Sequence, residues 1–228
     1  MQTRQSCRWH VYDAADAVAQ AATELILSAA RQAIARSGAF HIVLAGGTTP
    51  RRVYAALARS PADWAHWHIW FGDERCLPPE DGERNSVMAA QAWLDRVPIP
   101  PTQVHAIPAE LGATAAATAY TCQLASQGPF DLVLLGLGED GHTASLFPGH
   151  DWGTTAAAPD ALAVFDAPKP PPERVSLSAQ RLSRAHAVIF LVTGAGKRQA
   201  VANWRAGLSI PAAAITPADG VDILLDHA

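Results

Sequence analysis

The residues best suited to chemistry lie in one glycine-rich segment, residues 130–149. The segment opens with an apolar run, Leu132 to Leu135, and continues through three glycines and an acid pair to His142. Such a run is typical of a strand buried on both faces. Open α/β sheets bind their ligands in loops at the carboxyl ends of these strands, and histidine exchanges its proton near neutral pH. His142 is therefore the first candidate for chemistry.

A second stretch that could bind a ligand begins Ala-Gly-Gly-Thr-Thr-Pro-Arg-Arg at position 45. We predict a strand, a glycine turn and a helix that starts at Pro50, with Thr49 as its cap. The first N–H groups of a helix are unpaired and carry partial positive charge, so they bind phosphate well. The alternative is an ordinary strand–turn–helix junction with surface arginines. The candidate anion site consists of Gly46, Gly47, Thr48, Thr49 and Arg51.

Charged residues follow two further predicted strands. Asp73 and Arg75 flank a glutamate directly after an aromatic-rich strand, at the same sheet edge as the glycine turn. Lys197 follows a strand and a Gly-Ala-Gly turn at a helix start, which suits one phosphate. A nucleotide P-loop is excluded there, because Leu191 stands where its first glycine should be. The alternatives are a solvated turn and a solvated lysine.

The elements that must position these residues alternate between strands and helices. Strands are predicted at residues 8–12, 40–45, 66–72, 104–107, 132–135, 174–178, 186–193 and 221–225, and helices at 13–37, 50–57, 85–95, 114–127 and 197–206. Residues 150–172 are proline-rich and predicted to be irregular. The alternation predicts a single α/β domain over residues 1–228. Its expected architecture is an open, mostly parallel, Rossmann-like sheet flanked by helices, with a small antiparallel portion in the C-terminal half.

Composition and cysteine spacing exclude several other classes of protein. The net charge of −4 argues against a nucleic-acid or membrane partner that needs a broad basic face. No apolar run approaches the roughly 20 residues of a spanning helix. The three cysteines are far apart without metal-ligand spacing, so we expect a cytoplasmic protein. His66 and His68 share one predicted strand face but lack a third ligand, so no metal is expected.

Two motif matches are rejected. The stretch Gly136-Leu-Gly-Glu-Asp-Gly141 fits the dinucleotide-binding fingerprint, but that fingerprint requires a helix to begin there. Pro148 and Gly149 cut the following segment short, and the two acids would repel a pyrophosphate. A Gly-x-Ser-x-Gly nucleophile elbow does not occur, so covalent serine catalysis has no support in the sequence.

In this order, the segments resemble the 6-phosphogluconolactonase family, within the superfamily that also contains glucosamine-6-phosphate deaminases. The likeness covers nearly the whole chain, and its most specific part is the string around His142. The matching segments are Ala45-Gly-Gly-Thr-Thr-Pro50, Phe71-Gly-Asp-Glu-Arg75, Asp140-Gly-His-Thr-Ala-Ser-Leu-Phe-Pro-Gly149, Arg174-Val-Ser-Leu-Ser178 and Thr193-Gly-Ala-Gly-Lys197.

Two positions favour the lactonase branch over the deaminase branch. The deaminase loop typically carries a glutamate that partners its histidine in sugar ring opening, and Phe147 stands at the aligned position. A phenylalanine cannot accept or relay a proton. Arg75 stands where the deaminases usually have a tyrosine, as in the lactonases. One departure concerns the Ser-Asn of many relatives, which is Arg84-Asn85 here, so Asn85 is carried over only weakly and Arg84 is left as an extra phosphate contact.

The resemblance implies hydrolysis of 6-phospho-D-glucono-1,5-lactone in the oxidative pentose phosphate pathway, without a cofactor. His142 is then expected to be the general base, with Asp140 orienting its ring or the water. We expect the Gly46–Thr49 turn with Arg51, together with Arg174 and Lys197, to bind the 6-phosphate. Asp73 is expected to hold an arginine or a sugar hydroxyl, and the oxyanion donor is either Arg75 or the glycine-turn N–H groups.

Two other functions remain open at this stage. One is a glucosamine-6-phosphate deaminase or isomerase, and the other is a non-catalytic sugar-phosphate sensor. The expected partner in each case is a small sugar phosphate. The sequence does not determine the oligomeric state, for which a monomer is slightly favoured.

Overall fold

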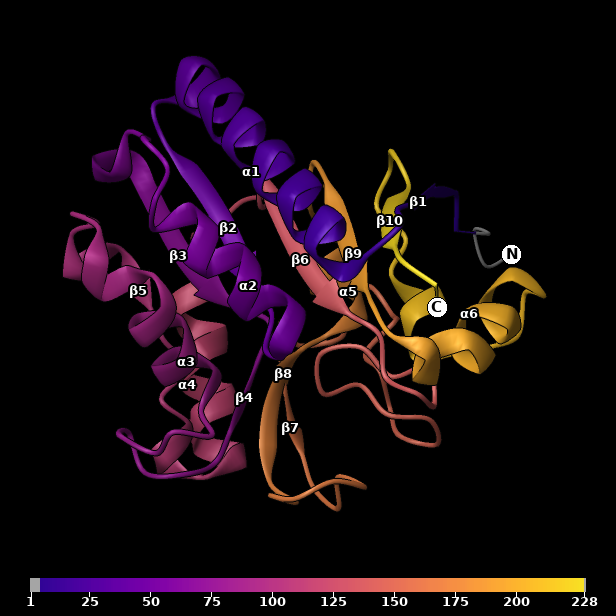
Figure 1. Ribbon diagram of the computed structural model, residues 1–228. Helices are drawn as coiled ribbons and strands as arrows, with labels where there is room; N and C mark the ends of the chain where they lie inside the picture. The colour runs from indigo at the N-terminus through magenta and orange to yellow at the C-terminus, as the bar shows by residue number, and fades with distance from the viewer. Residues whose placement is uncertain (1–4, 228) are drawn as a thin grey trace.

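The computed structural model describes residues 5–227, and its centre is a seven-stranded sheet in which every neighbouring pair is parallel (Figure 1). The strand order is β1-β10-β9-β6-β2-β3-β5. The predicted mostly parallel α/β sheet is confirmed. Its strands are β1 (Cys7–Val11), β2 (Phe40–Leu44), β3 (Trp67–Phe71), β5 (Val104–His105), β6 (Leu132–Gly136), β9 (Val188–Val192) and β10 (Val221–Leu225).

The middle strands explain why the sheet must be covered on both faces. All five residues of β9 and the first four of β6 are buried, as is typical of parallel strands between two helical layers. From β2 the chain continues outward to β3 and β5, whereas from β6 it continues the other way to β9 and β10. The order therefore reverses between β2 and β6, and a crevice forms where the strand order of an α/β sheet reverses.

Helices of very different length cover this sheet. The α-helices are α1 (Ala15–Ser37), α2 (Thr48–Leu57), α3 (Asn85–Ala92), α4 (Ala113–Leu124), α5 (Ala179–Ser183) and α6 (Arg198–Arg205). Six short 3₁₀ turns connect them: η1 (Trp64–His66), η2 (Leu94–Arg96), η3 (Pro101–Gln103), η4 (Ala109–Leu111), η5 (Ala195–Lys197) and η6 (Pro211–Ala214). In Figure 1, α1 and α2 lie side by side across one face of the sheet. None of the helices in residues 5–227 is long and apolar enough to cross a membrane.

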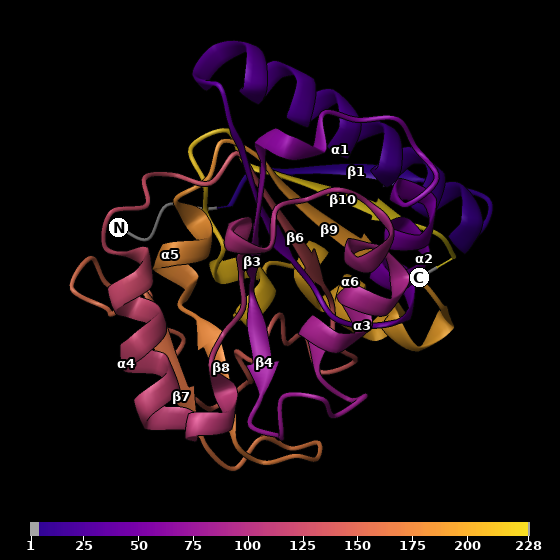
Figure 2. The same ribbon diagram turned by 90° about the vertical axis from the view of Figure 1, so that its left-hand side faces the viewer.

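A second, antiparallel sheet of three strands stands beside the first. It consists of β4 (Asp73–Arg75), β8 (Arg174–Leu177) and β7 (Ala161–Val164), with β8 in the middle. Figure 2 shows α4 running along β7. The predicted small antiparallel portion is thus confirmed, although one of its strands comes from the N-terminal half. The prediction of an irregular segment at 150–172 was wrong at β7, because its four apolar residues form a strand only through pairing with β8.

Two local predictions also differ from the structure. Helix α2 begins at Thr48 rather than Pro50, and Gly47, with φ of 111°, is its N-cap. Thr49 makes no capping bond; its hydroxyl instead lies 2.6 Å from that of Thr193. His66 lies in η1, outside β3, with Nδ1 2.8 Å from the carbonyl oxygen of Gly38. Within residues 5–227, no group of three His, Cys, Asp or Glu side chains could hold a metal ion.

Candidate active site

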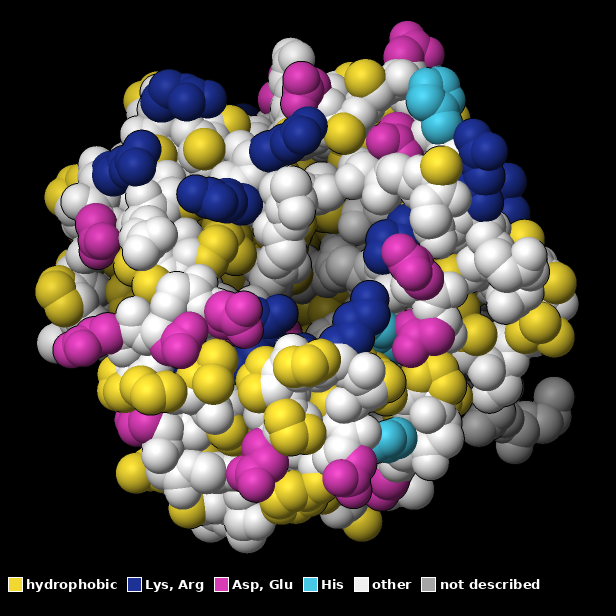
Figure 3. Space-filling model, turned by 60° about the horizontal axis from the view of Figure 1, so that its bottom comes forward, with side chains coloured by type: hydrophobic (Ala, Val, Ile, Leu, Met, Phe, Trp, Pro, Cys, Tyr) yellow, Lys and Arg dark blue, Asp and Glu magenta, His cyan; other side chains and the backbone are white. Residues whose placement is uncertain are grey.

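A cavity of about 420 Å³ opens at the carboxyl ends of β2, β6 and β9, where the strand order reverses. Figure 3 shows this face of the molecule, with Lys and Arg side chains around a central hollow. The structure brings together nine of the eleven predicted site residues as its lining, namely Gly46, Gly47, Thr48, Thr49, Asp73, Arg75, His142, Arg174 and Lys197. The other two are Asp140, which contacts His142, and Arg51, which is exposed outside the cavity.

The imidazole of His142 is held by the carboxylate two residues before it. Asp140 Oδ1 lies 2.5 Å from His142 Nδ1 and also accepts the backbone N–H of His142 at 3.1 Å. Burial raises the pKa of Asp140, but the hydrogen bonds and charge of His142 outweigh it, so that pKa lies below its ordinary value. An ionised carboxylate only accepts hydrogen bonds. His142 Nδ1 is therefore the donor, and Nε2 keeps the lone pair that can remove a proton.

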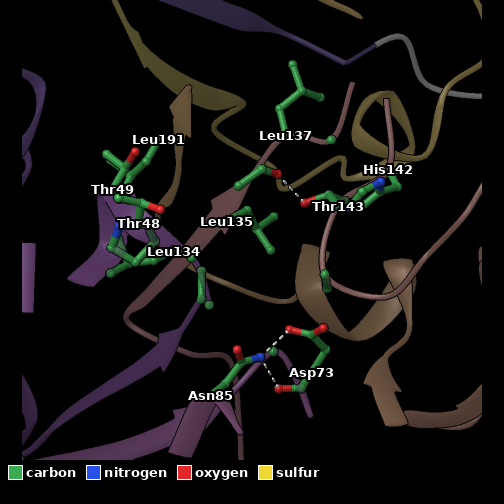
Figure 4. A pocket seen from close by; sticks show the side chains of 18 of the residues that line it. Thr48, Thr49, Asp73, Asn85, Leu134, Leu135, Leu137, His142, Thr143 and Leu191 are labelled. Atoms are coloured by element: carbon green, nitrogen blue, oxygen red, sulfur yellow. Dashed lines mark hydrogen bonds between the residues drawn. The ribbon is translucent and has the colours of Figure 1, made fainter. Parts of the chain in front are cut away.

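The loop around His142 depends on two glycines and a threonine. A Cβ on Gly138 would lie 2.0 Å from His142 Nδ1, so only glycine leaves room for the ring. Gly141 has φ of 87°, a conformation that favours glycine. The Thr143 hydroxyl donates to the carbonyl of Gly136 at 2.8 Å, which ties the loop back to β6 (Figure 4). No helix follows these glycines, in agreement with the rejection of the dinucleotide fingerprint.

The glycine turn after β2 forms the opposite wall. Its backbone passes so close to Asn85 that a Cβ on Gly46 would lie 2.0 Å from the amide oxygen. The buried hydroxyl of Tyr54 braces the turn, because it donates to the carbonyl of Ala45 at 2.8 Å and accepts the N–H of the same residue at 3.0 Å. The first N–H groups of α2 lack partners within the helix, so this wall offers donors to an anion.

Asp73 belongs to a buried polar network between β4 and the two loops. Its Oδ1 accepts the Asn85 amide at 3.0 Å (Figure 4). Its Oδ2 accepts the Ser145 hydroxyl at 2.6 Å. The end of β3 is fixed in a similar way, because the buried Tyr120 hydroxyl accepts the Phe71 N–H at 3.0 Å. Asp73 thus lines the cavity, but the expected arginine is not its bonding partner. Asn85, which was carried over only weakly, is part of the wall.

Four cationic side chains line the cavity: Arg75, Lys169, Arg174 and Lys197, called here the pocket cations. Within the described part of the chain, none of them forms an ion pair with a carboxylate. Burial lowers the pKa of Lys197, and Lys169 lowers it further, against the opposite effect of Glu139 and Asp140. This arrangement leaves positive charge without a paired carboxylate, available to an anionic ligand.

Arg84 is not a phosphate contact, contrary to the expectation. Its side chain is only 3% exposed and pairs with Glu110 at 2.9 Å and with Glu74 at 3.5 Å. It also donates to the carbonyls of Ile107 at 2.8 Å and Leu77 at 3.3 Å. Arg84 therefore serves the fold. Sequence reasoning missed Lys169 and Thr193, both of which line the cavity.

Comparisons with known proteins agree with this geometry. Residues 13–224 match the family of glucosamine-6-phosphate isomerases/6-phosphogluconolactonase. The chain belongs to this family. It is 40% identical over 203 residues to a 6-phosphogluconolactonase of Streptomyces coelicolor, which covers 81% of this chain and 77% of that one. A 6-phosphogluconolactonase of Mycobacterium tuberculosis is 36% identical, covering 95% and 94%.

The solved structures give the same result. The crystal structure of a 6-phosphogluconolactonase from Thermotoga maritima superposes with a TM-score of 0.88 at 25% identity, covering 97% of this chain and all of that one. Because the family includes both isomerases and lactonases, the residues of the site must separate them. The ring of Phe147, at the position of the deaminase glutamate, is buried 4.8 Å from that of His142. No carboxylate is available at that position.

Proposed function

We propose that this protein hydrolyses 6-phospho-D-glucono-1,5-lactone to 6-phospho-D-gluconate, with His142 as the general base. The observation that carries the proposal is the bond between His142 Nδ1 and ionised Asp140 in a cavity with four unpaired cations. The relatives named above, which are 6-phosphogluconolactonases, support the reaction. Phe147 beside the imidazole argues against the deaminase and isomerase alternatives, which need a carboxylate there.

The proposed reaction uses water as the nucleophile. His142 Nε2 removes a proton from water, and the oxygen attacks the lactone carbonyl carbon to form a tetrahedral intermediate. The bond from that carbon to the ring oxygen then breaks, and protonated His142 returns its proton to the leaving alkoxide. General base catalysis of this kind contributes about 10²–10⁴ in rate. Because a lactone is an already reactive ester, no covalent intermediate is needed.

The oxyanion and the phosphate of the substrate are expected to bind the hydrogen-bond donors that line the cavity. The carbonyl oxygen becomes an oxyanion in the intermediate, and donors already in place stabilise such charge. The candidates are Arg75 and the N–H groups of the Gly46–Thr49 turn, both in the lining. The phosphate is assigned to Lys197 and the same turn, and Arg174 lines the cavity beside them. Arg51 is dropped from this set because it lies outside the cavity.

The test generates the lactone with glucose-6-phosphate dehydrogenase and follows its decay with and without the protein, above the spontaneous rate. His142→Ala should lower kcat about 100-fold or more while KM changes little. His150→Ala is the matched control, because His150 also contacts Phe147 but is not in the lining of this cavity. Unchanged turnover in His142→Ala would refute the general base, and ammonia release from glucosamine 6-phosphate would revive the deaminase.

A cytoplasmic monomer remains part of the proposal. The three widely spaced cysteines support a reducing compartment. Light scattering on the purified protein tests the monomer, and a particle of twice the chain mass would overturn it. Cell fractionation tests the compartment.

A further inference from the structure

The use of lysine in this chain is unusual. Of the 17 basic Lys and Arg residues only two are lysines, Lys169 and Lys197. Both line the same cavity. They arrive from distant segments, since Lys197 ends η5 after β9, whereas Lys169 lies on the turn between β7 and β8. Lysine is a compact point charge on a flexible stem and a common phosphate ligand, whereas arginine prefers planar bidentate partners.

The turn that carries Lys169 is built around Arg174. The Arg174 side chain is buried, yet its hydrogen bonds go to backbone carbonyls of this turn rather than to an acid. Nη2 donates to Lys169 at 2.8 Å and to Pro170 at 3.1 Å, and Nε donates to Pro171 at 3.1 Å. Three of its five N–H directions are thereby committed to holding the turn. Arg174 therefore fixes the backbone of Lys169, whose side chain is exposed.

The charges of Lys169 and Lys197 repel each other. Apart from burial, Lys169 contributes to the lowered pKa of Lys197, which places the two ammonium groups in the same field. Glu139 and Asp140 act on Lys197 in the opposite direction, Glu139 more strongly than Lys169, but in residues 5–227 neither lysine forms an ion pair with a carboxylate. An anion bound between like charges removes their mutual repulsion and is itself stabilised by both. A dianionic phosphate carries two negative charges, which match the two positive charges of the lysines.

We propose that Lys169 is a phosphate-binding residue and that Arg174 is a positioning residue acting through it. This inference rests on the proposed function, because it assigns the phosphate end of the same substrate. It replaces the expectation that Arg174 itself contacts the phosphate. Lys169 and Lys197 then hold the phosphate from opposite sides, from the β7–β8 turn and from the start of α6.

The first test compares KM for the phosphorylated lactone with KM for unphosphorylated glucono-1,5-lactone. Lys169→Ala should raise the first about tenfold, as expected for one charge-assisted hydrogen bond, with kcat within about twofold. KM for the unphosphorylated lactone should stay unchanged. Arg59→Ala, an exposed arginine beyond the far end of α2, is the control. An unchanged KM for the phosphorylated lactone in Lys169→Ala would overturn the assignment.

The second test separates positioning from direct contact by a double-mutant cycle. Arg174→Lys should raise KM about as much as Lys169→Ala, because it keeps the charge but loses the bonds to the turn. In the Lys169→Ala background it should add less than about twofold, since residues that act as one unit are not additive. Multiplying effects would instead assign Arg174 to the phosphate. Thermal unfolding of each variant identifies any that fails to fold.

The third test does not need turnover. An amine-reactive reagent modifies only these two lysine side chains in the chain, and mass spectrometry resolves them. The product 6-phosphogluconate should protect both lysines, and gluconate should protect neither. Protection of Lys169 without any lactone hydrolysis would overturn the lactonase activity alone. Lactone hydrolysis with Lys169 fully reactive under saturating 6-phosphogluconate would overturn the role of Lys169 alone.

Discussion

Arg84 and Arg174 are buried to nearly the same degree, 3% and 6% exposed, but their surroundings differ in kind. Arg84 lies between two carboxylates, those of Glu74 and Glu110. Among the described residues, Arg174 donates hydrogen bonds to carbonyl oxygens alone, and its burial lowers its pKa despite the nearby Asp73. Burial alone therefore does not tell which role a cation has. The bonding partners differ instead, because Arg84 binds carboxylates whereas Arg174 holds the turn that carries Lys169.

Several arginines outside the cavity also pair with acids. Arg8 pairs with Asp222 at the surface, and Arg36 pairs with Asp131 between elements. The pocket cations form no such pair among the described residues. The fold thus leaves these cations without a paired carboxylate, which costs stability but provides positive potential for an anion.

The largest effect should follow removal of the paired cation. Arg84→Ala leaves Glu74, which is fully buried, with its hydrogen bonds but without its counter-charge. Breaking a buried pair in this way costs about 3–5 kcal/mol of the free energy of unfolding. Urea unfolding measures it, with Arg59→Ala as the control. A loss below about 1 kcal/mol would break the comparison, because Arg84 would then not differ from a surface arginine.

Removal of an unpaired cation should affect binding instead of folding. Lys197→Ala is expected to raise KM for the lactone about tenfold or more, with a change in the free energy of unfolding below about 0.5 kcal/mol. Steady-state kinetics and urea unfolding on the same preparation check both halves. A fall in kcat alone would contradict the phosphate role.

The affinity for the product should depend on pH through Lys197. Burial and Lys169 lower the pKa of Lys197, so the ammonium loses its proton at a lower pH than an ordinary lysine. The affinity for 6-phosphogluconate should therefore weaken as pH rises through this pKa, by several-fold. Calorimetry with the stable product avoids spontaneous lactone hydrolysis. Lys197→Arg should remove the dependence, and an identical pH profile in that variant would contradict the assignment.

Removing the charge of the nearby Glu139 should lower KM instead of raising it. Glu139 raises the pKa of Lys197 and is exposed beside Gly196. Its carboxylate repels a bound phosphate, so Glu139→Gln should lower KM about twofold, the scale of an exposed charge interaction. Glu80→Gln, an exposed acid outside the cavity lining, serves as the control. A higher KM in Glu139→Gln would show that the acid assists binding.

Histidines on β2, β3 and β5 give an effect of another kind, which concerns stability at acid pH. The rings of His41, His68 and His105 stack across the sheet, with centroids 4.5 and 5.6 Å apart. Burial, His68 and His41 lower the pKa of His105 to about 4. The unfolded chain therefore binds a proton that the folded chain excludes, and stability should fall as pH drops from about 6.5 towards 4. Thermal unfolding of His105→Gln should show a shallower fall, and an equal one would refute this.

Much of the fold was predictable because its signals are local. The buried apolar runs of β6 and β9, the 23-residue helix α1 and the stop at Gly38 are all visible in the sequence. The resemblance to the family is confirmed, and most predicted site residues meet in one cavity. Strand β7 was missed because its stability comes from pairing with β8, which no local pattern reports.

The errors at the site have the same origin. Arg51, Arg84 and Arg174 look alike in the sequence, each an arginine near a motif, but one is outside the cavity, one is paired and one holds a turn. Only the arrangement of partners separates them. For Lys169 a signal did exist, since the chain has a single other lysine.

The two buried tyrosines have an optical consequence. Tyr54 and Tyr120 hold the backbone at Ala45 and Phe71, next to the two walls of the cavity, and burial raises the pKa of both phenols. In alkaline solution both phenols should ionise only after their hydrogen bonds to Ala45 and Phe71 break. The chain has one other tyrosine. Phenolate absorbance would then report the opening of the cavity walls, with no label attached.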